Sequence, residues 1–292
     1  MPQPGIEGWC GGKERAMTEE RQARSAELAE ILRHMGSLLV AFSGGVDSSF
    51  LLASAVHVLG DRVVAATARS ELYPEAELRQ ARELAAKLGV RHIVFTSDEM
   101  ARPAFASTPP NRCYYCKREL FGKLAEMARD EGMDWVAHAA HTDDLTDHRP
   151  GLQAADELGI RAPLVEAGLS KDDIRALARD LGLPVWDKPA QACLASRIPY
   201  GDCITGAKVA QVEAAEEALR RQGFQQLRVR HHGSVARIEV PPAELPRLLD
   251  EEMRSRIVRD LQAAGFTYVT LDLQGFRSGS MNEVLGADPD AV

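Results

Sequence analysis

The stretch Ser43-Gly44-Gly45-Val46-Asp47-Ser48-Ser49 decides the fold of the first part of the chain, because it lies between an apolar run and an amphipathic one. Residues 38–42 predict a short buried strand, and residues 47–59 predict the helix that follows it. A strand that ends in glycines and hydroxyl residues and then opens a helix can bind an anion, because the glycines allow close backbone approach and the first helical amides are donors. The stretch has neither the lysine of a Walker loop nor the spacing of a dinucleotide fingerprint. An ordinary glycine turn before a helix is the alternative.

Strand-like and helical patterns alternate after this stretch. The strand-like runs are residues 62–67, 91–96 and 135–137, and the helical ones are residues 74–88 and 117–130. Such alternation predicts an α/β fold in which parallel strands are joined by crossover helices. Ligands of these sheets bind at the carboxyl ends of the strands, and the loop formed by residues 43–49 is expected to lie there.

The order of elements changes in the second half of the chain. Two further helices are expected within residues 151–183, where Ser170 followed by Asp173 predicts the start of the second one. Residues 184–204 show no period, and a loop of that length is more often functional than idle. From residue 205 a helix, two strands, helices and a last strand predict a small α+β domain with an antiparallel sheet.

Composition narrows the class of protein. The 292 residues contain no apolar run near the ~20 residues needed to span a bilayer, and residues 1–20 lack the apolar centre of a secretory signal. We therefore expect a cytoplasmic protein with no membrane partner. The net charge of −8 argues against a nucleic-acid partner, which normally needs clustered Lys and Arg. Five cysteines in a cytosolic chain indicate metal-binding or catalytic roles rather than disulfides.

A pair of cysteines lies in the stretch Asn111-Arg112-Cys113-Tyr114-Tyr115-Cys116-Lys117, just before a helix predicted to begin at Lys117. This spacing brings two thiolates close enough to share a metal or cluster, or to form a redox disulfide. A four-cysteine zinc site would need a second pair, which the chain lacks. Two unrelated cysteines are the alternative.

Another cysteine, Cys193, lies in the long loop among small residues, with Ser196 and Arg197 just beyond it. This arrangement is typical of an accessible thiol beside an anion site, although Cys is also among the most buried residue types. A thiolate is a good nucleophile towards an activated carboxylate or carbonyl.

The 43–49 stretch resembles the PP-loop of ATP pyrophosphatases, which hold ATP by its pyrophosphate and transfer AMP to a substrate. The resemblance implies a parallel-sheet domain of the adenine nucleotide alpha hydrolase type and implies that ATP is held by Ser43, Gly44, Gly45, Asp47, Ser48 and Ser49. Arg69 and Ser70 lie where such enzymes bind adenosine. Asp143 and Asp144 resemble the second motif of the superfamily and imply Mg²⁺ on the pyrophosphate, since hard oxygen ligands suit that ion. A solvated acidic turn is the alternative for these two residues.

Several motifs in one order make the chain similar to the LarE family, ATP-dependent sulfur transferases that help to make the nickel-pincer cofactor of lactate racemase. The matching stretches are the 43–49 loop, residues 111–117, His148-Arg149-Pro150-Gly151-Leu152, Cys193-Leu194-Ala195-Ser196-Arg197, and Gly275-Phe276-Arg277-Ser278-Gly279-Ser280. The chain departs from the family at His141, where an asparagine is usual.

The family implies a two-step reaction on a pyridinium-dicarboxylate mononucleotide. ATP adenylylates a carboxylate, and sulfur carried by Cys193 then displaces AMP to give a thiocarboxylate. Members with that cysteine alone give up its sulfur, whereas members that also carry the Cys-x-x-Cys pair hold a 4Fe-4S cluster with three cysteines. Because this chain has Cys113, Cys116 and Cys193, we favour the cluster form, although Cys203 is a competing ligand ten residues after Cys193.

The resemblance also implies partners and a division into domains. Ser196, Arg197, Arg230 and Arg277 are expected to bind the substrate phosphate, a task that suits the bidentate guanidinium. A homo-oligomer and other nickel-pincer biosynthesis proteins are the expected partners. We expect an extension at residues 1–20, the ATP-binding domain at 21–190, a linker with the active cysteine at 191–204, the small domain at 205–283 and a tail at 284–292.

Three other functions remain open from the sequence. A tRNA thiolase of the same superfamily can also combine a PP-loop with three cysteines, but it would need a basic surface. A non-catalytic ATP-binding module would release no pyrophosphate. An amide-forming synthetase leaves the three cysteines unexplained.

Overall fold

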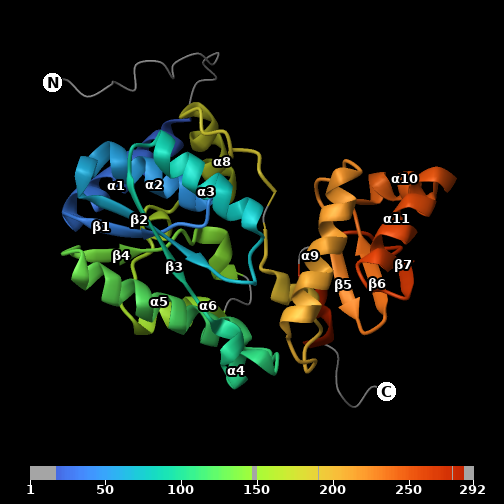
Figure 1. Cartoon of the computed structure of the whole chain (residues 1–292). Helices are drawn as coiled ribbons and strands as arrows, with labels where there is room; N and C mark the ends of the chain where they lie inside the picture. The colour runs from blue at the N-terminus through green and yellow to red at the C-terminus, as the bar shows by residue number, and fades with distance from the viewer. Residues whose placement is uncertain (1–17, 147–149, 190, 278, 286–292) are drawn as a thin grey trace. The chain divides into compact units, whose positions relative to one another are not determined.

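The computed structural model describes residues 18–146, 150–189, 191–277 and 279–285 (Figure 1). Contacts divide the chain into two compact units. The first comprises the described residues of Met1–Arg69, Glu75–Ser97 and Cys113–Ala190, and the second those of Ser70–Pro74, Asp98–Arg112 and Gln191–Val292. Most of the predicted extension and of the predicted tail lies outside the described residues.

A four-stranded parallel sheet forms the centre of the first unit, as the alternating pattern predicts. Its strands are β1 (Leu38–Ala41), β2 (Val63–Arg69), β3 (Arg91–Thr96) and β4 (Trp135–Ala137), in the order β3-β2-β1-β4. Leu38 of β1 pairs with Val63 on one side and with Trp135 on the other. β1 is therefore an inner strand. The strand order reverses between β1 and β4, because β2 and β3 lie on one side of β1 and β4 lies on the other.

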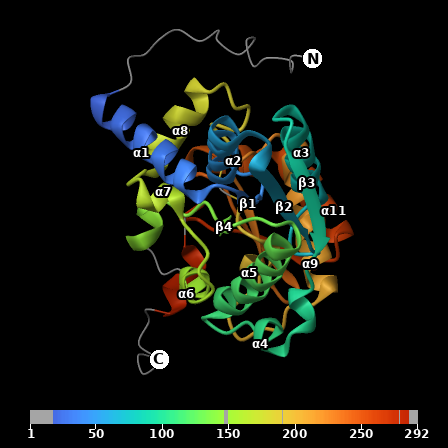
Figure 2. The same cartoon turned by 90° about the vertical axis from the view of Figure 1, so that its left-hand side faces the viewer.

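Helices cover both faces of this sheet. The helices are α1 (Glu19–Met35), α2 (Val46–Leu59), α3 (Glu75–Lys87), α5 (Arg112–Asp130), α6 (Pro150–Glu157), α7 (Pro163–Glu166) and α8 (Lys171–Asp180). Figures 1 and 2 show α1, α2 and α8 on one face and α5 and α6 on the other. The two faces follow from alternation along β1, because Leu38 and Val40 pack with α1 and α2 whereas Leu39 packs with α5.

Two elements of the first unit differ from the sequence-based expectation. Helix α1 begins at Glu19, where the sequence predicted the end of an extension. Helix α5 begins at Arg112 rather than at Lys117, so that Cys113 and Cys116 lie inside its first turns. The start of α8 is confirmed, because Ser170 and Asp173 form a capping box.

The second unit contains a three-stranded sheet and its own helices. Its strands are β5 (Arg228–His232), β6 (Val235–Glu239) and β7 (Tyr268–Leu271), and its helices are α4 (Pro103–Ala106), α9 (Gly206–Arg221), α10 (Leu245–Leu249) and α11 (Glu251–Ala263). β5 and β6 are antiparallel, but β6 and β7 are parallel. The expectation of an antiparallel sheet was therefore wrong for β7, because α10 and α11 return the chain to the starting end of β6.

Segments from the first half of the chain belong to this second unit. The amide of Leu194 donates to the carbonyl of Leu72 at 2.9 Å, and that of Gly201 donates to the carbonyl of Thr108 at 3.1 Å. Thr108 has a φ of 52°, an uncommon conformation for a β-branched residue. The turn that follows Cys193 is thus fixed to the segments after β2 and β3.

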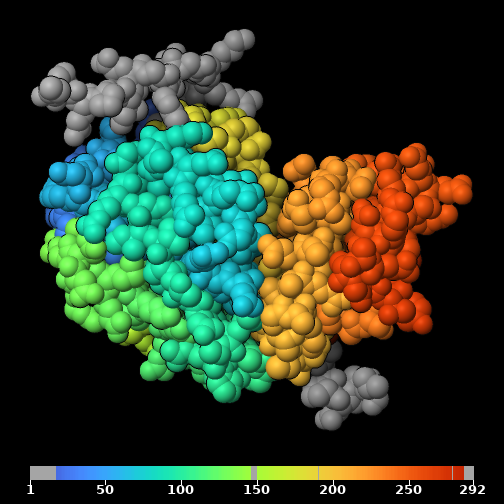
Figure 3. All heavy atoms as spheres, viewed as in Figure 1, coloured from blue at the N-terminus to red at the C-terminus, as the bar shows by residue number. Residues whose placement is uncertain are grey.

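Figure 3 shows all heavy atoms in the same view, and residues of α3 lie at the surface that faces the viewer. Across the described residues, no helix combines the length and the apolar character needed to cross a bilayer.

Candidate active site

The 43–49 loop connects the end of β1 to the start of α2 and keeps the N-terminal amides of that helix available. Gly45 is the N-cap of α2, and no side chain caps the helix there. Gly44 has a φ of 73°, and a Cβ at this position would lie 3.1 Å from the Cβ of Ala81 on α3. Because glycine alone fits both constraints, the backbone can approach a bound anion closely.

Hydroxyl groups line the same loop. The Oγ atoms of Ser43 and Ser48 are 3.0 Å apart, and Ser48 also donates to the carbonyl of Gly45 at 3.2 Å. Ser49 is fully buried, and its Oγ has no hydrogen-bond partner among the described residues. The loop therefore offers neutral donors to an anion but no positive charge of its own.

Two lysines from later in the chain supply positive charge beside the loop. The Nζ of Lys188 lies 3.4 Å from the carbonyl oxygen of Gly44 and 2.6 Å from Oε2 of Glu77. The Nζ of Lys171, at the start of α8, lies 2.6 Å from both carboxylate oxygens of Asp47. Sequence reasoning missed both lysines, because only the fold brings them to a loop more than a hundred residues earlier.

The acidic residues after β4 meet the same end of the sheet. The backbone amide of Lys171 donates to Oδ2 of Asp143 at 2.8 Å, so Asp47 and Asp143 both lie against Lys171. Asp144 is buried and accepts from the amide of His141 at 3.1 Å. His141 is also buried, with Nε2 3.6 Å from Oδ2 of Asp144. The loops after β1 and β4 thus converge, as expected for the carboxyl edge of a parallel sheet.

The residues expected at adenosine have partners of their own. Nε of Arg69 donates to Oε1 of Glu75 at 2.9 Å, with both side chains well exposed. Ser70 donates its hydroxyl to Oε2 of Glu99 at 2.8 Å, and Glu99 is buried. Ser70 also accepts from the amide of Leu72, so its hydroxyl already shapes the turn after β2.

The Cys-x-x-Cys pair lies one helical turn apart at the start of α5. Cys113 is exposed and Cys116 is buried. His138, just after β4, is neutral at physiological pH because burial and the nearby Lys117 lower its pKa to about 4. Within the residues that the structure describes, no group of three His, Cys, Asp or Glu side chains is placed to hold a metal ion. Three members of the quoted motifs, His148, Arg149 and Ser278, lie outside the described residues.

Cys193 opens a short 3-10 turn, Leu194–Arg197, in the second unit. We call residues 192–198 the cysteine turn. Cys193 is half-buried, whereas Arg197 is almost fully buried and donates to the carbonyl oxygens of Ala192 and Cys193 at 2.6 and 2.9 Å. The guanidinium of Arg197 therefore fixes the backbone that carries the thiol.

Arg197 also forms a bidentate ion pair with Glu216 of α9, at 2.7 and 3.0 Å. Burial by itself would raise the pKa of Glu216, but the charges of Arg197 and Arg220 hold that pKa below its ordinary value. The amide of Val229 donates to the same carboxylate at 3.1 Å. Glu216, which the sequence did not single out, thus joins α9, the cysteine turn and β5.

Arg230 on β5 makes a second ion pair of the same kind, with the buried Glu239 of β6 at 3.0 and 2.8 Å. Its Nη1 donates to the carbonyl of Ser196 at 2.8 Å. Arg228 is buried beside these groups, and burial together with the positive charge of Arg197 lowers its pKa to about 10. Arg277 is more accessible and pairs with Glu283 at 2.9 Å. The arginines expected at the substrate phosphate therefore gather in one unit, but Arg197 and Arg230 already have carboxylate partners.

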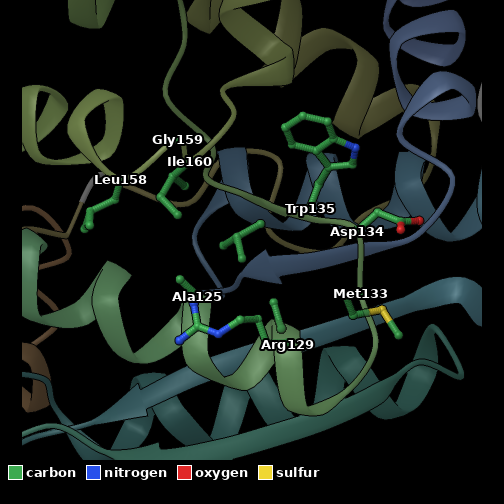
Figure 4. A pocket seen from close by; sticks show the side chains of 10 residues that line it. Ala125, Arg129, Met133, Asp134, Trp135, Leu158, Gly159 and Ile160 are labelled. Atoms are coloured by element: carbon green, nitrogen blue, oxygen red, sulfur yellow. The ribbon is translucent and has the colours of Figure 1, made fainter.

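A pocket of about 210 Å³ lies elsewhere in the first unit, and Figure 4 shows its lining residues. Trp135, the first residue of β4, lines it together with Arg129 of α5 and Leu158. The pocket is therefore at the amino ends of the strands. The candidate site is at the opposite, carboxyl edge, where the 43–49 loop, Asp143 and Lys171 converge.

Replacing Gly44 with alanine is expected to weaken ATP binding about 10-fold or more, because the new Cβ has both an unfavourable φ and a contact with Ala81. Gly60→Ala is the matched control, since Gly60 ends the same helix with a φ of 64° and has nothing within 4 Å of its Cβ position. Isothermal titration with ATP measures both variants. Equal losses in the two would show that the close approach to Ala81 does not matter.

Comparison with known proteins identifies the family of the chain. The asparagine synthase family model matches residues 28–113, which include the 43–49 loop. The pyridinium-3,5-bisthiocarboxylic acid mononucleotide synthase of Lactiplantibacillus plantarum is 42% identical over 263 residues, which cover 90% of this chain and 95% of that protein. An uncharacterized protein of Synechocystis is 44% identical over 265 residues, with 90% and 98% covered. A tRNA-specific 2-thiouridylase MnmA of Azorhizobium caulinodans is 32% identical over 218 residues, 61% of this chain and 55% of that protein.

The match to the Lactiplantibacillus synthase runs through both units, so it includes the nucleotide loop and the cysteine turn alike. The thiouridylase, by contrast, shares a smaller part of the chain. The chain therefore belongs to the LarE family, whose members are ATP-dependent sulfur transferases of the PP-loop ATP pyrophosphatase superfamily.

Proposed function

We propose that this enzyme converts a carboxylate of pyridinium-3,5-dicarboxylate mononucleotide into a thiocarboxylate in two steps. In the first, a carboxylate oxygen attacks the α-phosphorus of ATP, the bond to the β-phosphate oxygen breaks, and pyrophosphate leaves. In the second, sulfide attacks the carboxyl carbon with its lone pair, the C–S bond forms, and AMP leaves with the electron pair of the broken C–O bond. The name of the Lactiplantibacillus relative supports this substrate, and the observation that carries the proposal is the combination of an anion loop after β1 with a fixed, half-buried Cys193.

The first step needs donors and charge at the pyrophosphate. The amides at the start of α2 and the hydroxyls of Ser43 and Ser48 suit the leaving group, and Lys188 lies beside them. We propose that Asp143 and Asp144 position Mg²⁺, since carboxylates at the carboxyl edge suit this ion. Arg69 and Ser70 remain our proposed adenosine contacts.

The second step needs a sulfur at the acyl adenylate. Three guanidinium groups hold the carbonyls of the cysteine turn, so the backbone that carries the Cys193 thiol is held before the substrate binds. We propose that the cysteine turn presents sulfur to the carboxyl carbon. Ser196, Arg197, Arg230 and Arg277 remain the proposed site for the phosphate of the mononucleotide, and Arg277 is the most accessible of the three arginines.

We further propose Cys113, Cys116 and Cys193 as ligands of a 4Fe-4S cluster. The fit rests on the donor set, because Cys113 and Cys116 lie one turn apart on one side of α5 and thiolates are the usual ligands of such clusters. When bound, a cluster with three protein ligands has an iron that can carry sulfide, so that Cys193 need not lose its own sulfur. Family membership also supports a homo-oligomer that works in the cytoplasm with other nickel-pincer biosynthesis proteins.

Anaerobic turnover with ATP, sulfide and the dicarboxylate mononucleotide tests the proposal. We expect pyrophosphate, AMP and thiocarboxylate, measured by mass spectrometry. More product than enzyme with Cys193 intact supports the cluster form, and stoichiometric product with dehydroalanine at Cys193 supports loss of the cysteine sulfur. Absence of pyrophosphate with substrate present would overturn the proposal and leave an ATP-binding module.

Replacing Cys113 with alanine is expected to lower the iron content of anaerobically reconstituted protein to background, because two thiolates hold such a cluster poorly. Iron analysis and the visible absorbance of the cluster measure this loss. Cys203→Ala is the comparison, and it should keep its iron. If Cys203→Ala loses its iron and Cys193→Ala keeps it, the third ligand of the cluster is Cys203 and not Cys193.

A further inference from the structure

Three buried arginines hold the backbone of the cysteine turn, and they differ in how their charge is compensated. Arg197 is bound to the carbonyls of Ala192 and Cys193, and its charge is neutralised by Glu216. Arg230 is bound to the carbonyl of Ser196, and its charge is neutralised by Glu239.

Arg112 is the third, and among the described residues it has no salt-bridge partner. It is 4% exposed, its Nη1 lies 3.3 Å from the carbonyl oxygen of Ile198, and its guanidinium lies 4.7 Å from the ring centre of Tyr200. The hydroxyl of Tyr200 donates to Asn282 at 2.9 Å, which helps to hold the ring in place. A guanidinium has five donor hydrogens, so most of the donors of Arg112 have no protein acceptor among the described residues.

A buried cation without a counter-charge is costly, because desolvation removes its hydration and no carboxylate replaces it. The aromatic ring and one carbonyl offset only part of that cost. Arg112 differs in this respect from Arg197 and Arg230, which hold the same turn but each have a glutamate as counter-charge. It is therefore suited to an anion that arrives with the ligand.

We propose that Arg112 binds the carboxylate of the substrate that is not reacting, which makes it a specificity-determining residue. The proposal rests on the proposed function, because it takes the dicarboxylate mononucleotide as the substrate. A planar guanidinium matches a carboxylate in a bidentate pair, and one positive charge matches one negative charge. The phosphate carries more charge, and its proposed site remains Ser196, Arg197, Arg230 and Arg277.

The chemistry gives this contact a clear role. The sulfur must reach one carboxyl carbon. When Arg112 binds the second carboxylate, the pyridinium ring is held in one rotational position relative to Cys193. A substrate with two equivalent carboxylates can then be turned over and processed at the other one. In that second round, Arg112 holds the thiocarboxylate made in the first.

Binding of three ligands to the intact protein tests the proposal by isothermal titration. The ligands are the dicarboxylate mononucleotide, the pyridinium-3-carboxylate mononucleotide that lacks one carboxylate, and the dicarboxylate nucleoside that lacks the phosphate. We expect Arg112→Gln to weaken dicarboxylate mononucleotide about 10- to 100-fold and to leave the monocarboxylate nearly unchanged, as for loss of one charged hydrogen-bonded pair. Arg118→Gln, an exposed arginine on the same helix, is the matched control and should bind all three ligands as the wild type does.

The outcomes separate the inference from the proposed function. If Arg112→Gln still prefers the dicarboxylate as strongly as the wild type, the inference is wrong even though the substrate is right. The inference is also wrong if the variant no longer prefers the dicarboxylate mononucleotide to the nucleoside that lacks the phosphate, while its preference for the second carboxylate is unchanged. If the wild type binds none of the three ligands, the proposed function fails. Arg112→Lys keeps the charge in case the glutamine variant does not fold, and it should retain part of the preference for the second carboxylate.

Discussion

Replacing Cys193 with alanine is expected to lower thiocarboxylate formation at least about 1,000-fold, because the variant lacks the group that delivers sulfur to the carboxyl carbon. The first step should continue, since the 43–49 loop, Asp143 and Lys188 all lie in the first unit, whereas Cys193 belongs to the second. Pyrophosphate and AMP should therefore still form from ATP in the presence of the dicarboxylate substrate, as the acyl adenylate reacts slowly with water.

Quenched-flow sampling with mass spectrometry distinguishes the two steps. The wild type should release pyrophosphate and thiocarboxylate together, whereas Cys193→Ala should give pyrophosphate without thiocarboxylate. Normal thiocarboxylate formation by the variant would assign sulfur delivery to another cysteine. Loss of both products would show that Cys193 is needed for activation of the carboxylate or for folding, which circular dichroism then decides.

Replacing Glu216 with alanine is expected to destabilise the second unit by about 3–5 kcal/mol, the usual cost of breaking a buried ion pair. Glu216 is fully buried and accepts from Arg197, from Arg220 and from the amide of Val229. Its removal leaves the guanidinium of Arg197 buried without a carboxylate. The free energy of unfolding from urea titration, followed by circular dichroism, measures the effect.

Glu217→Ala is the matched control, because Glu217 lies next in the same helix, is 51% exposed and approaches Arg220 only to 3.9 Å. Its replacement should change the free energy of unfolding by less than about 1 kcal/mol. The pH dependence gives a second check. Because the folded protein holds the pKa of Glu216 below its ordinary value of 4.5, the stabilisation is present above pH 4.5 and is lost as the pH falls through the lower, folded pKa. The difference between wild type and Glu216→Ala should therefore shrink in acid, and a difference independent of pH would contradict the ion-pair account.

Sequence predicted the first unit well because its signals are local. The strand, the loop and α2 are contiguous, and alternation of strands and helices fixes a parallel sheet with little ambiguity. Helix α1 was not predicted as an element, since only Leu28, Leu32 and Met35 of its 17 residues are buried. The parallel pairing of β7 with β6 depends on where α10 and α11 return the chain, which strand propensity does not reveal.

The candidate site was predictable in its residue types but not in its partners. Sequence motifs identify Gly44, Ser48 and Cys193, and the motif at Cys193 includes Arg197. Nothing local shows that Arg197 is buried against Glu216, because a glutamate on α9 among other charged residues has the pattern of a solvated helix face. The same is true of Lys188 and Arg112. Lys188 contacts the carbonyl of Gly44 and Arg112 that of Ile198, and both partners lie far away in the sequence.

The inner position of β1 has a consequence for the order of events during synthesis. Leu38 pairs with Val63 on one side, but its other neighbour, Trp135, leaves the ribosome about a hundred residues later. Until then one edge of β1 has no strand beside it, and pairing between such distant segments is slow. The nascent chain therefore carries its nucleotide loop for many seconds before the sheet beneath that loop is complete, and ATP can help to select the folded form only after β4 has emerged.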